Sequence, residues 1–357
     1  MVNIRETDFN KVLFRLRFFA KTKQVKYIVF VEFLLFEEIM RNSISERFDI
    51  LKQFGGLPEP EVINEEWLYI LKEETRNSIL IEGFFVSDKE LEEVLVSGKP
   101  LKKNQEEALN YYRAARFLYG LAYENYRSGK FIFGTPLIRQ TSKTIGAKGG
   151  YRKGDSRITG AKIVPPPGLF VNDWMAFFEE YINQGFSSED FLGFLAKQHV
   201  VFETIHPFDD GNGRTGRIIL NYLLISAGYP PVILKGDEEN KTKYYKALEQ
   251  GDDFFRKLTA RQFSRQDVQS ALEDMDASLL TNFISESLRL SFDRILTRLF
   301  EEKEKIKLKP AREVGKTLDY SPDSMRTLIS RGKFIAVKRG KEWFTHENLF
   351  LKQEKSK

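Results

Sequence analysis

Hydrophobic residues recur along most of this chain every three or four positions, the spacing that places them on one face of an α-helix. Gly and Pro residues separate the segments that share this pattern. These segments cover residues 9–16, 25–39, 65–81, 105–126, 169–182, 191–205 and 218–224, with a shorter helix expected within 88–101. The pattern therefore predicts a mostly α-helical protein.

Residues 146–167 break the helical period. Gly149 and Gly150 precede short runs of alternating polarity, and three prolines at 165–167 end the segment. Glycine pairs and short alternating runs favour a β-hairpin or an extended flap. A long irregular loop inside a helical domain is usually functional or disordered. We therefore predict a small β-hairpin flap at this point of the chain.

The pattern changes again over residues 310–351. Two short helices are expected, over 311–318 and 323–331, and alternation around an Arg-Gly-Lys turn then predicts a small hairpin over 334–344. Helix, turn, helix and wing is a nucleic-acid-binding arrangement. It resembles excisionase-like and MerR-like winged modules.

Charge supports that interpretation only in part. The chain has a net charge of +5, and residues 301–357 alone carry 15 Lys and Arg against 9 Asp and Glu. Basic side chains on the second helix and the wing favour contact with phosphates. DNA binding through residues 310–345 and a protein-interaction role both stay open for this module.

Composition excludes several classes of protein. With 357 residues and 41% hydrophobic residues, the chain is expected to form two or three globular domains. It contains no cysteine and only three histidines, which excludes disulfides and thiolate chemistry and argues against a His/Cys zinc site. The most apolar run, residues 27–36, is too short to span a bilayer, and no signal-peptide pattern precedes it. We expect a cytoplasmic protein without a membrane partner.

The stretch 206–217 gathers the groups of an anion site. Gly211 and Gly213 lack a Cβ atom, so their backbone N–H groups are free to converge on an anion. The N-terminus of the following helix favours phosphate. Arg214 and Arg217 are three positions apart and share one face, and guanidinium groups suit phosphate oxygens. A phosphate-binding turn between two helices is therefore predicted.

Two residues beside this turn add acid–base and metal chemistry. His206 lies at its entrance, and an imidazole takes up a proton near neutral pH. Asp210 offers a hard oxygen ligand where Mg²⁺ bridging phosphates favours a carboxylate. A glycine-rich turn with solvated charges is the alternative. Phosphoryl-type chemistry is the better explanation, because each required group occurs once and in order.

The string His-Pro-Phe-Asp-Asp-Gly-Asn-Gly-Arg-Thr-Gly-Arg resembles the signature of the Fic family, His-x-Phe-x-Asp/Glu-Gly-Asn-Gly-Arg-x-x-Arg, at every fixed position. Fic enzymes mostly transfer AMP from ATP to a protein hydroxyl. By this resemblance, His206 is the base that deprotonates the target hydroxyl, and Asp210 holds Mg²⁺ or Mn²⁺. Asn212 and the glycine backbone around it bind the α-phosphate, and the two arginines bind the β- and γ-phosphates.

The flap and one tyrosine complete the ATP site that this resemblance implies. The flap of Fic proteins clamps the target segment by strand hydrogen bonds and lies over the nucleotide. Of the pair Tyr244 and Tyr245, we favour Tyr244 as the residue at the adenine or ribose, although either could simply pack in the core. The expected ATP-binding residues are Glu82, Thr159, Gly160, Ala161, Lys162, Gly211, Asn212, Gly213, Arg214, Thr215, Gly216, Arg217 and Tyr244.

A second short motif suggests how this site is restrained. Ser78 and Glu82 are four positions apart at the end of a predicted helix, and Gly83 follows them. The segment resembles the inhibitory motif of Fic proteins, Ser/Thr-x-x-x-Glu-Gly/Asn. In that family the glutamate pairs with the second arginine of the signature, which is Arg217 here. The alternative is a surface glutamate before a glycine cap.

Together these patterns predict a mostly α-helical Fic-type protein adenylyltransferase with a flap hairpin and a C-terminal winged helix. The expected partners are ATP and a protein with an exposed Ser, Thr or Tyr hydroxyl, which includes the chain itself, and a homodimer is left open. Removal of AMP, transfer of another phosphate-containing group, a nucleotide-sensing DNA-binding regulator and a toxin-like enzyme are the alternatives. The expected parts are an N-terminal helical segment (1–60), an inhibitory-helix region (61–118), a catalytic core (119–262), a helical connector (263–305) and the winged module (306–357).

Overall fold

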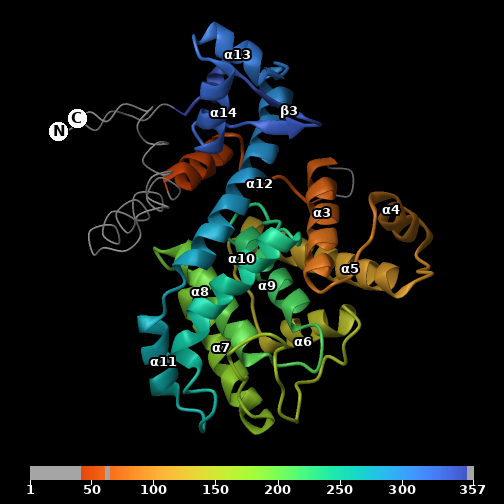
Figure 1. Cartoon of the computed structure of the whole chain (residues 1–357), viewed down its shortest axis with the longest axis vertical. Helices are drawn as coiled ribbons and strands as arrows, with labels where there is room; N and C mark the ends of the chain where they lie inside the picture. Colours follow the sequence, from red (N-terminus) through yellow and green to blue (C-terminus); the bar gives the residue numbers. More distant parts are fainter. Residues whose placement is uncertain (1–41, 61–64, 352–357) are drawn as a thin grey trace, which may run out of the picture.

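The computed structural model describes residues 42–60 and 65–351, and within them the chain is mostly α-helical, as predicted (Figure 1). Residues 42–53 are helical, and the helices expected over residues 1–41 lie outside the described part. The helices that follow are α3 (Glu65–Ile81), α4 (Asp88–Ser97), α5 (Lys103–Ser128), α6 (Thr135–Thr144), α7 (Val171–Gly185), α8 (Phe191–Ile205), α9 (Asn212–Ser226), α10 (Glu238–Asp252), α11 (Arg265–Asp274), α12 (Ser278–Glu304), α13 (Ala311–Thr317) and α14 (Pro322–Ser330). The strands are β1 (Lys309–Pro310), β2 (Val337–Arg339) and β3 (Glu342–Thr345), and the 3₁₀ turns are η1 (Gly168–Phe170), η2 (Asp253–Phe255) and η3 (Glu347–Leu349).

Helix α9 lies at the centre of the helical body. Its sequence is apolar on every side after Arg217, which is the pattern of a fully buried helix. Every residue of α9 except Gly213 is buried. Helices α3, α5, α6 and α8 all pack against it. The burial of α9 therefore fixes the position of its N-terminus, where the polar stretch begins.

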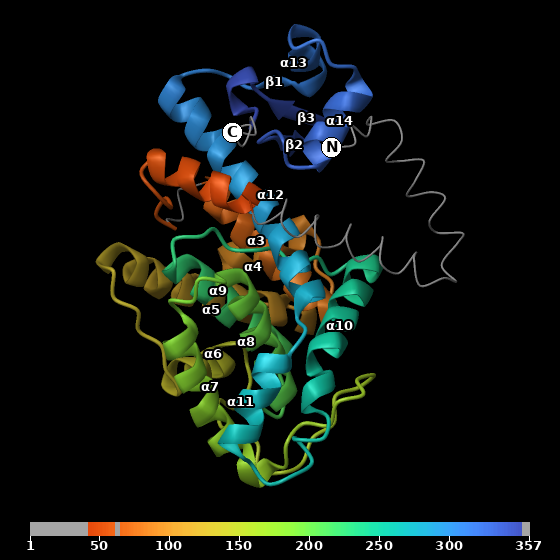
Figure 2. The same ribbon diagram turned by 90° about the vertical axis from the view of Figure 1, so that its left-hand side faces the viewer.

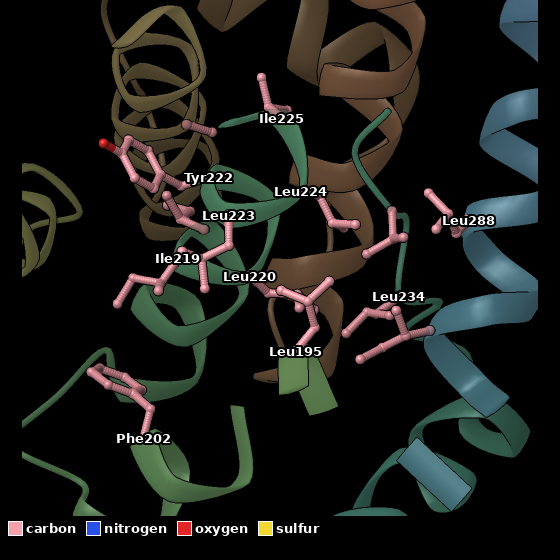
Figure 3. Packing of buried hydrophobic residues seen from close by; sticks show 14 of the residues in the cluster. Leu195, Phe202, Ile219, Leu220, Tyr222, Leu223, Leu224, Ile225, Leu234 and Leu288 are labelled. Carbon is pink, nitrogen blue, oxygen red and sulfur yellow. The ribbon is translucent and has the colours of Figure 1, made fainter. Parts of the chain in front are cut away.

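The core around α9 is built mainly of leucine and isoleucine. Figure 3 shows Leu195 of α8 close to Leu220 of α9, with Leu234 and Leu288 on the side toward α12. A fully buried leucine contributes roughly 1.5–3 kcal/mol relative to an exposed one. Several such contacts hold α8 and α9 together on both sides of the polar turn that joins them.

Helix α12 connects the body to the C-terminal residues. It spans 27 residues and runs from the lower body to the three-stranded sheet (Figures 1 and 2). Along its course it packs against α8, α10, α3 and finally β2. Residues 301–304 thus extend α12, and this helix seats the C-terminal module on the body.

The C-terminal module has its own small core. Helices α13 and α14 pack on an antiparallel sheet of order β1-β3-β2, in which Val337 pairs with Phe344. The buried residues of this core are Ala311, Val314, Met325, Ile329, Phe334 and Ala336. The two helices and the hairpin lie at the predicted positions, and Gly332 follows α14 with a φ of +70°.

The predicted hairpin over residues 146–167 is wrong. None of these residues forms a strand, so the segment is the extended alternative, an irregular flap. Arg152 explains this, because its guanidinium donates to the carbonyls of Gly154 (2.9 Å) and Pro166 (2.6 Å). The two ends of the flap are thus joined through a side chain, and the prolines at its exit have no N–H for a ladder.

No helix within residues 42–60 and 65–351 combines the length and the apolar character that crossing a bilayer requires.

Candidate active site

His206 ends α8 in a strained conformation. Its φ of 49° lies in the left-handed region, which is uncommon for a residue with a side chain. The His206 N–H donates to the Phe202 carbonyl (3.0 Å), and Nδ1 lies 3.4 Å from the Glu203 carbonyl oxygen. A carbonyl can only accept, so Nδ1 carries the proton and Nε2 keeps a lone pair. Burial lowers the pKa of His206 to about 4, which leaves the imidazole neutral at pH 7.

The turn between α8 and α9 is held by one amide side chain. Asn212 Oδ1 accepts from the Phe208 N–H at 2.8 Å, and Asn212 Nδ2 donates to the Phe208 carbonyl at 2.9 Å. The oxygen and the nitrogen of this buried side-chain amide therefore both bind within the turn itself. The predicted contact of Asn212 with phosphate stays a prediction, while its effect on the shape of the turn is plain.

Arg152 connects the flap to the catalytic turn. Besides the two flap carbonyls, its guanidinium donates to the carbonyls of Ile205 (3.1 Å) and His206 (2.8 Å). The Arg152 N–H also donates to the Pro207 carbonyl at 2.9 Å. A buried side chain with this many carbonyl partners orients both the backbone of His206 and the root of the flap. The sequence identified Arg152 only as part of the start of the flap.

Arg217 is held by the end of α3. Its Nε donates to Ser78 Oγ (2.6 Å), and its Nη2 donates to the Ser78 carbonyl (3.0 Å) and to Glu82 Oε1 (2.7 Å). Burial opposes the ionised form of each partner, but the opposite charge outweighs it, so the pKa of Glu82 is lowered and that of Arg217 is raised. The predicted contact between Glu82 and Arg217 is confirmed. Gly83, beyond the end of α3, has a φ of +87°, as a glycine cap requires.

Arg214 is engaged by two carboxylates. It forms an ion pair with Glu107 of α5 and a second one with Asp210 at 3.1 Å. Arg214 is buried, whereas 78% of the Asp210 side chain is exposed. Asp210 is thus accessible to solvent beside the anion site, and Glu107 is a partner that no sequence pattern indicated.

A cavity of about 590 Å³ joins these elements. Among the predicted residues it is lined by the histidine and the glutamate described above, part of the signature, part of the flap and a tyrosine. These are Glu82, Thr159, Gly160, Ala161, Lys162, His206, Gly213, Arg217 and Tyr244. Five other predicted residues are buried outside that lining, namely Gly211, Asn212, Arg214, Thr215 and Gly216. The lining also includes apolar side chains, namely Ile163, Val200 and Leu248.

Two buried acid–base groups lie under this cavity. Burial raises the pKa of Glu203 to about 8, so its carboxyl is largely protonated at neutral pH. It packs on Gly216, where a Cβ atom would come within 2.3 Å of Glu203 Oε1. Burial lowers the pKa of His199 to about 3, and its Nε2 lies 2.8 Å from the Tyr244 hydroxyl. His199 therefore has a structural role, since its neutral ring is buried and hydrogen-bonded to the tyrosine.

The structure thus adds Arg152, Glu107 and Glu203 to the predicted site. Arg152 and Glu107 act through partners that are distant in the sequence, and a single sequence does not reveal such contacts. Glu203 had one local signal, because it lies three positions before His206 and directly follows the apolar run 200–202 of α8. Tyr244 and Tyr245 both line the cavity in the structure. Tyr244 is buried, whereas Tyr245 is 45% exposed.

Comparison with known proteins identifies the family. Residues 136–224 match the Fic/DOC family. A probable protein adenylyltransferase of Aquifex aeolicus is 32% identical over 296 residues, which cover 79% of this chain and 87% of the relative. The protein adenylyltransferase Fic of Drosophila willistoni is 38% identical over 102 residues, or 28% of this chain and 20% of that one.

Solved structures agree at the level of the fold. A Fic-domain-containing signalling protein from Bacteroides thetaiotaomicron aligns with 71% of this chain and 96% of its own, with a TM-score of 0.55 and 20% identity. A fragment of Fic-1 from C. elegans aligns with 81% of this chain and 80% of its own, with a TM-score of 0.55 and 19% identity.

Proposed function

Because the chain belongs to the Fic/DOC family and is an adenylyltransferase, we propose that it transfers AMP from ATP to a Ser, Thr or Tyr hydroxyl of a protein. The acceptor is a separate target or the chain itself. We further propose that Glu82 restrains this reaction by holding Arg217.

The observation that carries the proposal is the meeting of three groups at one cavity. The neutral His206 imidazole, the backbone at Gly213 and the Arg217 guanidinium all line it. A base, a helix N-terminus and a fixed cation are the groups that transfer of a nucleotidyl group needs around the phosphates. The apolar side chains of the lining, together with Tyr244 and Tyr245, suit the adenosine.

In the proposed reaction the target hydroxyl oxygen attacks the α-phosphorus of ATP. His206 Nε2 takes the hydroxyl proton, a new ester bond forms, and the bond from the α-phosphorus to the leaving oxygen breaks. Pyrophosphate leaves with the electron pair of that bond. The backbone N–H groups at the start of α9 and the two signature arginines offset the charge on the phosphates, so that positioning and electrostatics supply most of the rate.

Asp210 is the residue that would hold Mg²⁺ or Mn²⁺. Its exposed carboxylate lies beside the anion turn, and Mg²⁺ in nucleotide sites is commonly bound by one or two carboxylates together with substrate phosphates. Within the described residues no group of three or more His, Cys, Asp and Glu side chains could hold a metal ion, which fits a cation that enters with ATP. Such an ion would neutralise phosphate charge during the transfer.

The proposed restraint follows from competition for Arg217. Its guanidinium makes three hydrogen bonds with Ser78 and Glu82, and an arginine held in this way is withdrawn from the γ-phosphate. A nucleotide then lacks one positioning contact, and a misplacement of about an ångström can cost roughly a hundredfold in rate.

Incubation with labelled ATP and Mg²⁺, followed by mass spectrometry of the labelled protein, tests the proposed reaction. We expect addition of one AMP residue to a hydroxyl side chain. His206→Ala should reduce the label by roughly 10²–10⁴-fold, the usual contribution of a general base, while ATP binding persists. An adduct of another mass would indicate transfer of a different group, and release of AMP from a modified protein would indicate hydrolytic removal of AMP.

A further inference from the structure

A second cavity lies between the C-terminal module and the body. It has a volume of about 950 Å³ and forms an open groove. The module contributes Arg326 and Ser330 of α14 and residues 337–340 of the wing. The body contributes residues of α3, α12 and the segment just before α10. Figures 1 and 2 show the module resting above α3 at the upper end of α12.

The groove is lined mainly by basic side chains, and its four arginines also pair with carboxylates outside the lining. The described residues that line it include one carboxylate, Glu73, and six cationic side chains. Three of the six come from the body and three from the module. They are Lys235, Arg289, Arg294, Arg326, Lys338 and Arg339. The positive potential is thus shared between the two parts and is not confined to the wing.

Several of these cations are incompletely neutralised. Lys235 and Lys338 form no ion pair with any described residue and are exposed. Arg289 shares the carboxylate of Asp293 with Arg47, at 3.6 Å and 2.6 Å, and Arg289 Nε has no hydrogen-bond partner among the described groups. One carboxylate between two guanidinium groups leaves a net positive charge at the floor of the groove.

The groove also offers flat surfaces for stacking. Tyr69 and Trp343 line it, and the Arg294 guanidinium lies 3.5 Å from the centre of the Tyr69 ring while it pairs with Glu66 at 2.7 Å. That pairing holds the guanidinium over the ring. Unstacked bases pack on aromatic rings and on guanidinium planes.

The shape of the groove excludes duplex DNA from its interior. A second helix that enters the major groove needs its exposed face clear of other protein. Here Arg326 and Ser330 of α14 share the groove with residues of α3 and α12. A space of about 950 Å³ admits a few nucleotides of one strand.

We propose that this groove binds a short stretch of single-stranded nucleic acid, with its phosphates on the lysines and arginines of both walls and its bases beside Tyr69 and Trp343. The site goes beyond the proposed function, because none of its groups lies at the AMP-transfer cavity. Glu73, Asn77 and Tyr69 belong to α3, the same helix that carries Ser78, so the strand lies against the back of the inhibitory segment.

Fluorescence anisotropy with the full-length protein tests this proposal. The probe is a labelled oligothymidine of about 12 nucleotides, a length within the usual site size of single-strand-binding proteins. Binding at low salt should weaken as salt rises, and each lost phosphate contact should reduce the slope of log K against log salt by about 0.7. Lys235→Glu in the body and Lys338→Glu in the wing should each weaken the binding of the oligonucleotide by roughly tenfold and lower that slope.

Lys341→Glu is the matched control, since Lys341 is an exposed wing residue that does not line the groove. It should leave the affinity nearly unchanged, and a duplex of the same length should bind more weakly. The proposal is overturned if the oligonucleotide does not bind at low salt. It is also overturned if Lys341→Glu weakens binding as much as Lys235→Glu, because the contact would then lie on the outer wing. Equal competition by polyglutamate of equal charge would overturn it too, because the groove would then be a site for acidic peptides.

Discussion

Glu82 Oε1 lies 2.7 Å from Arg217 Nη2, and the pair joins the end of α3 to the second turn of α9. Ser78 completes the contact through its hydroxyl and its carbonyl. A Cβ atom on Gly213 would come within 2.5 Å of Glu82 Oε1, so the carboxylate lies directly on the glycine turn. The same carboxylate thus occupies space beside the anion turn and engages one of its two arginines.

Glu82→Gly should raise AMP incorporation by about a hundredfold, because it frees Arg217 to position the nucleotide. Ser78→Ala should raise it less, since the lost hydroxyl removes one hydrogen bond and leaves the ion pair. ATP affinity should change less than the rate. The measurement is label incorporation at saturating ATP and Mg²⁺ for each variant beside the wild type.

The double variant Glu82→Gly/Arg217→Ala provides the control for this prediction. It should lose the gain, because the released guanidinium is what the first change supplies. Equal activity of the wild type and Glu82→Gly would show that Glu82 is an ordinary residue at the end of a helix.

The pH profile should report the burial of His206. With a pKa of about 4 the imidazole is already an effective base at pH 5, unlike a solvent-exposed histidine with a pKa of 6.5. At saturating ATP, kcat/KM for the target in the Glu82→Gly background should stay flat as pH falls from 7.5 to about 5. The charge of Glu82 raises the pKa of His206, so its removal moves the acidic limb lower still. A limb centred near 6.5 would contradict a buried base.

The local features of this site were open to prediction from the sequence. Helix α3 ends at Ile81 as predicted, because its apolar period stops where Gly83 follows. The spacing of Ser78 and Glu82 places both on one face, and only their contact with Arg217 needed the family resemblance. The glycine turn of the signature was predicted for the same reason, since its residues are adjacent in the chain.

What the sequence could not provide depends on contacts between distant residues. The flap is irregular because Arg152 binds carbonyls from the flap and from the end of α8. The partner of Arg214 is Glu107 on α5, and no periodicity within either helix indicates that pair. The groove at the C-terminal module likewise arises only when α3 and α12 are placed beside the wing.

The buried ion pair between Arg47 and Asp293 should contribute strongly to stability. Arg47 Nε donates to Asp293 Oδ1 at 2.6 Å, and Arg47 Nη2 donates to the Phe334 carbonyl at 3.2 Å, so one side chain ties α12 to the C-terminal module. The buried Asp293 carboxylate pairs with Arg47 and with Arg289, and Arg47→Met removes the closer of these two cations. Loss of one partner of such a pair costs roughly 3–5 kcal/mol.

Urea unfolding measures this effect, and Lys52→Met on the same helix is the matched control because Lys52 is exposed. The double variant Arg47→Met/Asp293→Leu should recover much of the loss, since it also removes the carboxylate that the first change leaves short of a partner. A loss in Arg47→Met no larger than in Lys52→Met would contradict a structural role for the pair.

Glu74 should make the protein less stable as pH rises above neutrality. It is buried between α3, α5 and α9, where Tyr111 and Asn221 donate to its Oε1 and its Oε2 has no partner among the described groups. Burial raises its pKa from 4.5 to about 8, against the hydrogen bonds that lower it. Between these two values the folded state keeps a proton that the unfolded state has released. Its contribution to stability is therefore complete below pH 4.5 and is lost as pH rises toward 8.

The buried histidines change the stability of the protein with pH in the opposite direction. His199 and His206 have folded pKa values of about 3 and about 4 against 6.5, so their contribution is lost as pH falls below 6.5. Above pH 6.5 the histidines no longer change the free energy of unfolding with pH. Glu74 and Glu203 still do. From pH 6.5 to 8 each carboxyl should lower the free energy of unfolding by about 2 kcal/mol.

Glu74→Gln tests this assignment, because an amide keeps the acceptor for Tyr111 and Asn221 and cannot ionise. Urea unfolding at pH 6.5 and at pH 8 should show about half the wild-type decline in this variant, and Glu203→Gln should remove the other half. Below pH 4.5, where both carboxyls are protonated in the folded and the unfolded state, both variants should match the wild type in the pH dependence that the histidines cause. If Glu74→Gln declines as steeply as the wild type, Glu74 is already ionised in the folded protein, and its hydrogen bonds to Tyr111 and Asn221 outweigh its burial.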